Sequence, residues 1–366
     1  MTGGSAAGPD RAVTGAGGPT AAAGPTGGPE VATVGEAMVV LTPDPMAPLE
    51  RADRLGVSVG GAESNLAIAL AGLGHRVGWV SRVGDDPFGR RVVRHVTDAG
   101  VDALVEVDPT APTGVYLKDP GPGGTAVHYY RSGSAASALG PDALDDRRLA
   151  GVRLLHLSGV TAALSPTCAA LVKCALTDRP LGDARISFDV NHRARLWPVA
   201  AAAPVLRRLA DRADVVLVGQ DEADTLWGCA DPVAVRALLP GPDLVVVKDA
   251  AVGATVLPRT GTAVFVPALR VPVREPVGAG DAFAAGFLSG LLRDLEPRDC
   301  LRLGHLCAAP TLTVPGDTAP PPGRALVDRL LALPAAAWAQ LDPVGAGLLP
   351  GTPVAASAAE RERSGG

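Results

Sequence analysis

Aromatic residues are scarce in this 366-residue chain, at 3% of the total, whereas 47% of its residues are apolar. We therefore expect a substantial core built from Ala, Val and Leu rather than from rings. No charge-free apolar run reaches the length of about 18 residues that a membrane-spanning helix needs. The net charge is −5, whereas a nucleic-acid or anionic-membrane surface requires a clustered positive field. We expect neither kind of partner.

Cysteine is also rare. The five cysteines include no Cys-x-x-Cys pair and lie in apolar segments, which argues against a disulfide framework. The N-terminus lacks the apolar segment of a signal peptide. We expect free, buried thiols and a cytoplasmic location.

Several common site motifs are missing. The chain has three lysines (Lys118, Lys173 and Lys248) and none follows a glycine, which excludes a P-loop. No complete Gly-x-Gly-x-x-Gly occurs, which argues against a dinucleotide-binding oxidoreductase, and no histidines have zinc-ligand spacing. Residues 56–60 match Gly-x-Ser-x-Gly, but the alternation around Ser58 predicts a strand, not the strand–turn–helix elbow of α/β-hydrolases.

Composition divides the chain into three parts. Residues 1–29 are rich in Gly, Pro and Ala, and we expect them to be disordered. Residues 30–335 form one folded domain in our interpretation, and residues 336–366 a low-complexity tail.

Within the domain, short β-branched runs alternate with Ala/Leu-rich segments of helical spacing, as in 77–80 followed by 87–98. This alternation predicts an α/β fold with a mostly parallel central sheet covered by helices on both faces. Two segments, about 38–60 and 112–131, lack intervening helices, and we expect them to form a small β-sheet lid.

The strongest local signal is the Pro-Val-Gly-Ala-Gly-Asp turn of residues 276–281, which precedes a predicted helix over 282–292. Glycines at 278 and 280 let backbone N–H groups close around an anion at the positive end of the helix dipole. A carboxylate there suits a base that deprotonates an attacking hydroxyl, but Asp281 is equally suited to be a plain helix cap. A second glycine-rich turn, Gly60-Gly61, opens the segment that carries Asn65.

These two segments, GGAESN with the following GWVSRVGDDPFG and PVGAGDAFAAGF, resemble the signatures of the ribokinase-like (phosphofructokinase B type) carbohydrate kinases. Within that family, the segments HYYRSGSAA (128–136), HLSGVT (156–161) and DVNHRARLW (189–197) resemble the 2-keto-3-deoxygluconate kinases. The resemblance covers about residues 30–335 and implies the ribokinase-like fold.

The resemblance also implies site residues. It makes Asp281 the catalytic base, and Gly278, Ala279 and Gly280 with it the anion hole. The residues that would line the sugar site are Gly60, Gly61, Asn65, Tyr116, Tyr129, Arg131, Arg193, Asp281 and Asp317. An arginine such as Arg131 can bind the carboxylate of a sugar acid with two parallel hydrogen bonds.

For the nucleotide, the resemblance implies contacts from Asn191, Arg193, Lys248, Asp249, Ala250, Gly253, Gly278, Gly280 and His305. Glu222 matches the last carboxylate of the family's magnesium motif. The implied cofactors are therefore ATP and Mg²⁺, and a requirement for a monovalent cation stays open.

The chain departs from the family pattern at Glu275, Ala250, Gly219 and His305, and Pro310 falls inside a predicted helix. These departures leave the base and anion hole intact but affect the nucleotide side.

The function that the resemblance implies is ATP-dependent phosphorylation of a sugar-acid hydroxyl, from 2-keto-3-deoxygluconate to its 6-phosphate. Two alternatives stay open: a fructokinase-like kinase of neutral sugars, and a sugar-binding regulatory protein that has lost kinase activity. The implied partners are the sugar acid and ATP, with homodimerisation through the lid by analogy to the family.

Overall fold

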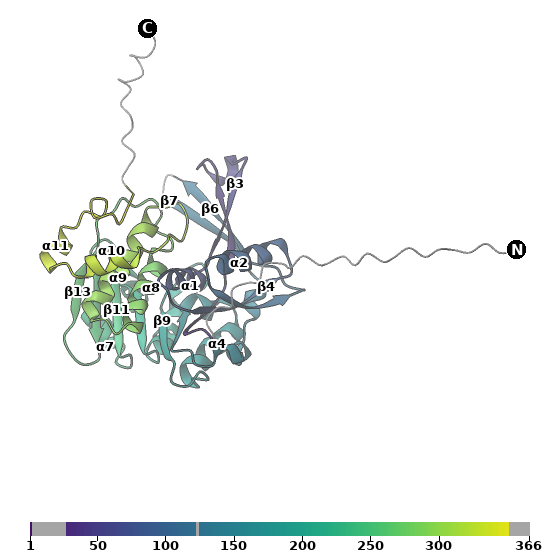
Figure 1. The fold of residues 1–366 in the computed structure, drawn as a ribbon. Helices are drawn as coiled ribbons and strands as arrows, with labels where there is room; N and C mark the ends of the chain where they lie inside the picture. The colour runs from purple at the N-terminus through teal and green to yellow at the C-terminus, as the bar shows by residue number, and fades with distance from the viewer. Residues whose placement is uncertain (2–26, 122–123, 351–366) are drawn as a thin grey trace, which may run out of the picture.

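The computed structural model describes Met1 and residues 27–121 and 124–350, and within these residues the strands form two sheets (Figure 1). The expectation of a disordered segment over 1–29 falls almost wholly outside the described residues. No helix of the described part is both long and apolar enough to cross a membrane.

The large sheet has the strand order β13-β12-β11-β10-β9-β8-β1-β4-β5. From β11 to β5 every neighbouring pair is parallel, and only the β11–β12 and β12–β13 pairs are antiparallel. Such strands are buried on both faces, which explains their β-branched runs. The strands are β1 (Val31–Val34), β4 (Val77–Gly84), β5 (Asp102–Asp108), β8 (Leu154–Ser158), β9 (Arg185–Asp189), β10 (Val215–Gly219), β11 (Leu244–Asp249), β12 (Gly253–Pro258) and β13 (Val264–Pro267).

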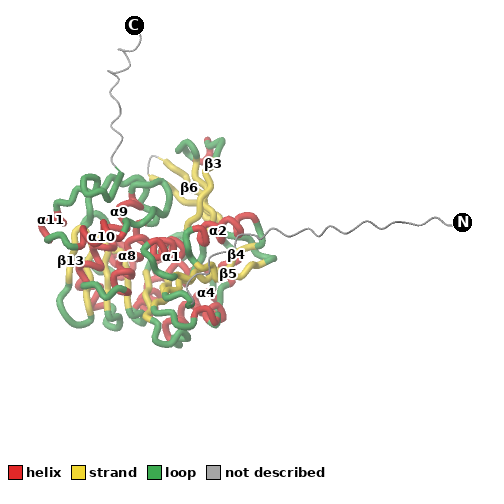
Figure 2. Tube along the Cα trace, in the orientation of Figure 1, coloured by secondary structure: helices red, strands yellow, loops and turns green. Residues whose placement is uncertain are grey.

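Helices cover both faces of this sheet, as predicted (Figure 2). Val216 and Val218 of β10 contribute to one core cluster, whereas Val215 and Leu217 contribute to the other. The first cluster is covered by α3 (Gly159–Leu164), α4 (Pro166–Thr177), α5 (Val199–Ala210), α6 (Gln220–Trp227) and α7 (Pro232–Leu238). The second is covered by α1 (Ala62–Gly72), α2 (Pro87–Asp98), α8 (Ala279–Leu292), α9 (Pro297–Leu312), α10 (Arg324–Leu331) and α11 (Ala335–Ala339).

The small sheet has the order β3-β2-β6-β7, and its strands extend from one end of the large sheet (Figure 1). Its strands are β2 (Met38–Pro43), β3 (Leu55–Gly60), β6 (Val115–Gly121) and β7 (Gly124–Tyr130), which confirms the predicted separate sheet, and we call it the lid. Ser58 pairs with Val40 inside β3, so the hydrolase elbow is excluded. Short 3₁₀ turns are η1 (Leu49–Arg51), η2 (Ala135–Ala138), η3 (Pro141–Leu144) and η4 (Arg147–Leu149).

The chain passes between the large sheet and the lid four times. These passages lie between β1 and β2, between β3 and α1, between β5 and β6, and between β7 and η2, and each contains a glycine: Gly35, Gly61, Gly114 and Gly133. At Gly61 a Cβ would lie 2.4 Å from the Glu36 carbonyl oxygen, so only glycine fits there.

The folded part continues past residue 335, where composition placed the start of a low-complexity tail. Trp338 on α11 is buried, as are Leu348 and Leu349 further on. The Trp338 indole N–H donates to the Pro267 carbonyl of β13, and the Arg302 guanidinium lies 4.9 Å from the ring centre. The predicted boundary was wrong because one aromatic side chain in an Ala-rich segment anchors the segment to the domain.

We predict that Trp338→Ala lowers the free energy of unfolding by about 3–5 kcal/mol, as for other buried Trp-to-Ala changes. The change also exposes the buried Arg302 guanidinium. Urea denaturation measures the loss, and Gln340→Ala, at an exposed position of the same segment, is the control. Equal stability of the two variants would show that the segment does not contribute to the fold.

Candidate active site

The two glycine-rich motifs of the sequence meet in space. The Asn65 side-chain amide, on the first turns of α1, donates a 2.9 Å hydrogen bond to Oδ2 of Asp281, on the first turn of α8. The residues are separated by 216 positions in the chain. Both helices lie on the same face of the large sheet, and their N-termini converge at its carboxyl edge, where ligands of open α/β sheets usually bind.

The turn that precedes α8 depends on Gly278. This residue has φ 83°, and a Cβ at its position would lie 1.8 Å from the Asp317 carbonyl oxygen. Any other residue would be strained and would push the Asp317 backbone away. The helix itself begins at Ala279, three residues earlier than predicted, so the backbone N–H groups of its first turn are free of intrahelical partners. This arrangement is suited to an anion.

Asp281 lies beside that turn and is partly exposed. Burial raises the pKa of its carboxyl to about 7; Asp189 also raises it, whereas the hydrogen bond from Asn65 lowers it. A carboxylate with a pKa near neutrality can act as a general base at physiological pH.

Lys248, at the end of β11, connects this turn to the neighbouring strands. Its Nζ lies 2.7 Å from Oδ2 of Asp189 at the end of β9, and 3.8 Å from where a Cβ of Gly280 would be. Burial lowers the pKa of Lys248, but Asp189 and Glu222 outweigh burial and raise it above its ordinary value. Asp189, which the sequence analysis did not single out, is buried, and its Oδ1 has no hydrogen-bond partner in the described residues.

Glu222 lies close to Lys248 and Asp189, but its carboxylate is engaged at the start of α6. Its two oxygens accept N–H groups from His192 and Gly219, at 2.9 Å each. Burial and the charge of Asp189 raise its pKa. Within the described residues no group of three or more His, Cys, Asp or Glu side chains has the arrangement of a metal site.

The remaining residues expected to contact a nucleotide fall into two sets. Asn191 and Ala250 both have positive φ, 39° and 38°, a conformation that residues other than glycine rarely adopt. Asp249 ends β11 and Gly253 begins β12, so both lie close to Ala250 in the chain. Arg193 is exposed, and its positive charge lowers the pKa of Asp281. His305, by contrast, is buried: its Nε2 donates to the Val266 carbonyl and its ring contacts Phe283 edge-on.

Several residues predicted to line the sugar site lie in or beside the lid, among them Gly60 at the end of β3. A Cβ at Gly60 would lie 2.5 Å from Oδ2 of Asp317 and 2.7 Å from the Tyr116 hydroxyl oxygen. Tyr116 donates a 2.6 Å hydrogen bond to that carboxylate oxygen, and burial together with Asp317 raises its pKa. The rings of Tyr116 and Tyr129, which are paired across β6 and β7, lie 5.6 Å apart.

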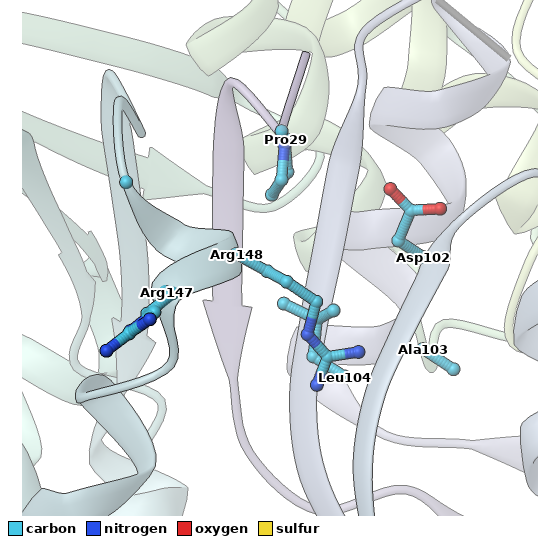
Figure 3. Close-up of a pocket in the computed structure, with 8 residues that line it drawn as sticks. Pro29, Asp102, Ala103, Leu104, Arg147 and Arg148 are labelled. Atoms are coloured by element: carbon cyan, nitrogen blue, oxygen red, sulfur yellow. The ribbon is translucent and has the colours of Figure 1, made fainter. Parts of the chain in front are cut away.

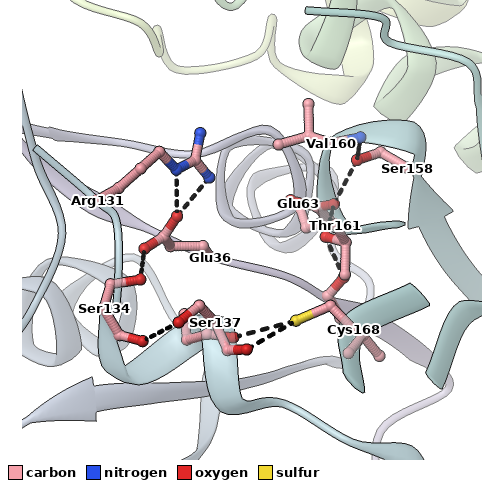
Figure 4. A network of polar contacts seen from close by, with 11 residues as sticks. Glu36, Glu63, Arg131, Ser134, Ser137, Ser158, Val160, Thr161 and Cys168 are labelled. Carbon is pink, nitrogen blue, oxygen red and sulfur yellow. Dashed lines mark hydrogen bonds and ion pairs between the residues drawn. The ribbon is translucent and has the colours of Figure 1, made fainter. Parts of the chain in front are cut away.

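Arg131, just after β7, has a partner that the sequence analysis missed. Its guanidinium forms an ion pair with the buried Glu36 carboxylate, which also accepts a hydrogen bond from Ser134 (Figure 4). Arg131 also lies 5.6 Å from the centre of the Tyr129 ring. Nε and Nη2 of Arg131 therefore bind Glu36, and within the described residues Nη1 has no hydrogen-bond partner.

A second buried carboxylate lies near this pair. Oε1 of Glu63 accepts hydrogen bonds of 2.6 Å from the Ser158 and Thr161 hydroxyls (Figure 4), and burial raises its pKa. Its side chain fills the space where Gly35 would otherwise carry a Cβ. This network fixes the passage between β1 and β2 against the start of α1.

The structure also has a hollow far from these residues. A cavity of about 630 Å³ is bordered by Pro29, Asp102, Leu104 and two arginines, 147 and 148 (Figure 3). Because Pro29 and Asp102 lie where β1 and β5 begin, the hollow is at the amino edge of the sheet, opposite Asp281.

Comparison with known proteins identifies the class of this fold and site. Residues 29–324 match the family model described as pfkB family carbohydrate kinase. The 2-dehydro-3-deoxygluconokinase of Thermoproteus tenax is 36% identical over 81% of this chain and 93% of its own length. The enzyme of that name from Bacillus subtilis is 33% identical over 79% and 91%. The chain therefore belongs to the PfkB family of carbohydrate kinases.

Solved structures agree with this assignment. A PfkB protein from Polaromonas sp. JS666 is 36% identical, with a TM-score of 0.74 over 82% of this chain and 99% of its own. An E. coli protein described as a candidate ribokinase II, solved with ATP and Mg²⁺, is 22% identical, with a TM-score of 0.75 over 82% and 98%. The fold is thus ribokinase-like, as expected from the sequence.

We predict that kcat/KM rises with pH through about 7 if Asp281 is the general base, because its carboxyl would then have to be ionised to accept a proton. Asn65→Ala removes a hydrogen bond that stabilises the ionised form, so the midpoint of this rise moves to higher pH. Steady-state rates between pH 5.5 and 9 measure the midpoint of the rise in kcat/KM. Ser64→Ala, which removes only a bond to the Gly61 carbonyl, is the control. An unchanged midpoint in Asn65→Ala would contradict the assignment.

Proposed function

We propose that this kinase transfers a phosphoryl group from ATP to a hydroxyl of a 2-keto-3-deoxy sugar acid, with 2-keto-3-deoxygluconate and its 6-phosphate as the substrate–product pair. One observation carries the proposal. The Asp281 carboxyl, with a pKa near 7, lies at the glycine turn of α8 and accepts a hydrogen bond from Asn65, which belongs to the other family motif. An Asp that only capped a helix would not need a partner from a second motif.

In the proposed reaction, Asp281 accepts the proton of the acceptor hydroxyl while the oxygen of that hydroxyl attacks the γ-phosphorus of ATP. The bond between the γ-phosphorus and the oxygen that bridges it to the β-phosphorus breaks, and ADP leaves. The backbone N–H groups of residues 278–281 stabilise the negative charge of the transferring group. The lid excludes water from the sugar side, which suppresses hydrolysis of ATP.

The residues present fit ATP with Mg²⁺. Lys248 offers an ammonium group beside Gly280, and the unpartnered Oδ1 of Asp189 offers a hard anionic ligand. Magnesium usually keeps most of its waters and binds one or two carboxylates plus phosphates, so a dedicated cluster of ligands is not required. When bound, ATP supplies the phosphoryl group and Mg²⁺ neutralises part of its charge. The engaged carboxylate of Glu222 suits a role in holding the loop at His192 rather than direct coordination.

The substrate class rests on the relatives and on two arginines. The relatives are named as kinases of dehydro-deoxy-gluconate and dehydro-deoxy-galactonate, all of which are sugar acids. Arg131 and Arg193 supply positive charge near Tyr129 and Asp281. We further propose a cytoplasmic location, in keeping with free cysteines throughout the described residues, and a homodimer formed through the lid.

A kinase of neutral sugars is the second candidate, and the Arg131–Glu36 ion pair favours it. Since Glu36 already neutralises Arg131, a substrate carboxylate would depend on Nη1 and on Arg193. Loss of kinase activity, the third alternative, finds support only in the departures on the nucleotide side, such as Ala250 with its positive φ.

A panel of sugars tests the proposed function. We expect the wild-type protein to consume ATP with 2-keto-3-deoxygluconate at a kcat/KM at least tenfold above that with fructose or ribose. Asp281→Asn, which keeps the shape but cannot accept a proton, should lower kcat by about 10²–10⁴-fold, the usual contribution of a general base, while sugar binding by calorimetry persists. A near wild-type rate for this variant would refute the role of Asp281.

Arg131→Ala separates the two candidate substrate classes. If Arg131 contacts a carboxylate, the variant should raise KM for the sugar acid by about tenfold or more and change KM for a neutral ketose much less, since a charge-assisted hydrogen bond contributes about 1.5–3 kcal/mol. Arg131→Lys keeps the positive charge but cannot form two parallel hydrogen bonds. Its KM for the sugar acid should therefore lie between those of the wild type and Arg131→Ala. Equal losses for both substrates would show that Arg131 serves only to hold Glu36.

A further inference from the structure

Lys118 is a buried lysine that the family resemblance does not account for. Its side chain is 3% exposed, although it belongs to the lid strand β6. Nζ donates a 2.8 Å hydrogen bond to Oε2 of Glu275 and a 3.0 Å hydrogen bond to Oδ1 of Asp317. Buried lysines are rare unless paired, and this one pairs with two carboxylates from distant parts of the chain.

The two carboxylates lie on either side of the turn at Gly278. Glu275 is three residues before Gly278, and its Oε1 accepts the Val277 N–H at 3.2 Å. Asp317 lies on the other side, with its backbone packed against the Gly278 Cα. A movement of either residue therefore displaces the backbone N–H groups of residues 278–281.

The lid reaches this turn through two side chains of one strand. Tyr116 and Lys118 are two residues apart, so both point to the same face of β6, and each binds one oxygen of the Asp317 carboxylate. Of the two carboxylates, Tyr116 hydrogen-bonds only to that of Asp317, whereas Lys118 also hydrogen-bonds to that of Glu275. Lys118 is thus the lid residue whose charge connects both sides of the turn.

We propose that Lys118 is a positioning residue: its ammonium group couples the position of the lid to the geometry of the Gly278–Asp281 turn. The inference rests on the proposed phosphoryl transfer at this turn. When β6 lies over the site, Lys118 holds Glu275 and Asp317 together and the N–H groups face the transferring group. When β6 moves away, two carboxylates are left facing each other without a cation and separate by repulsion. Phosphoryl transfer would then be favoured only beneath a closed lid.

Lys118→Met tests the proposal because it keeps the length of the side chain and removes its charge. We expect kcat to fall roughly 10- to 100-fold, the loss that a misplacement of about 1 Å can cause, while KM for ATP changes less than threefold. Lys118→Arg restores a donor to both carboxylates and should recover kcat to within about fivefold of wild type. His128→Gln, on the exposed side of β7, is the control and should match wild type. A kcat for Lys118→Met within twofold of wild type would overturn the proposal.

Glu275→Gln removes the same ion pair by a change in the turn instead of in the lid. It therefore keeps the proposal testable if Lys118→Met fails to fold. It should lower kcat in the same direction as Lys118→Met. A normal kcat in Glu275→Gln, with a loss in Lys118→Met, would show that Lys118 acts through Asp317 alone and would overturn the coupling.

Hydrogen–deuterium exchange gives a readout that needs no substrate. In the ligand-free full-length protein, peptides covering residues 275–283 should exchange several-fold faster in Lys118→Met than in wild type or His128→Gln, while peptides of β9 and β10 stay unchanged. Unchanged exchange at 275–283 would contradict the proposal. Because this measurement is independent of turnover, a wild-type protein inactive on every sugar of the panel would refute the proposed function without deciding the role of Lys118.

Discussion

The hydrogen bond between Asn65 and Asp281 is the contact on which the candidate site depends. It joins the N-termini of α1 and α8, which are far apart in the chain, at one edge of the sheet. Each helix is positioned by its own packing on the sheet, so the bond forms only if the whole α/β layer structure is correct. The carboxylate is consequently held in a place where burial disfavours its charge. The fold thus keeps the group near its protonation midpoint.

A second constraint is the crowding of charge around that carboxylate. Asp189 lies within electrostatic reach of both Glu222 and Asp281, and the charge of Lys248 acts on all three carboxylates. Near the residues predicted to line the sugar site, Lys118 likewise pairs with Glu275 and Asp317. Two of the chain's three lysines therefore lie at this edge, Lys248 among three carboxylates and Lys118 between two. A triphosphate bound at the glycine turn would face these cations and the backbone N–H groups of the turn.

Sequence patterns predicted the parts of this structure that depend on local order. The glycine turns, the separate lid and the layers of helices follow from residue types at short spacing, and the family motifs located Asp281 and Asn65. The partners of the charged groups were out of reach: Lys118 lies 157 residues from Glu275, and Arg131 lies 95 residues from Glu36. Only the folded chain determines such pairs. The anchoring role of Trp338 was missed for a local reason: the residues around it are mostly alanine and give no sign of a helix that packs on the domain.

The four glycine-bearing passages between sheet and lid have a mechanical consequence. A lid attached by a single pair of strands could open freely, but this lid is attached by the four passages at Gly35, Gly61, Gly114 and Gly133. Because all four passages attach the lid, a displacement of the lid would have to be shared among them. The passage at Gly114 continues into β6, and the passage at Gly61 leads directly into the first turns of α1, which carry Asn65. A displacement of the lid at the Gly61 passage would therefore act directly on the backbone that carries Asn65.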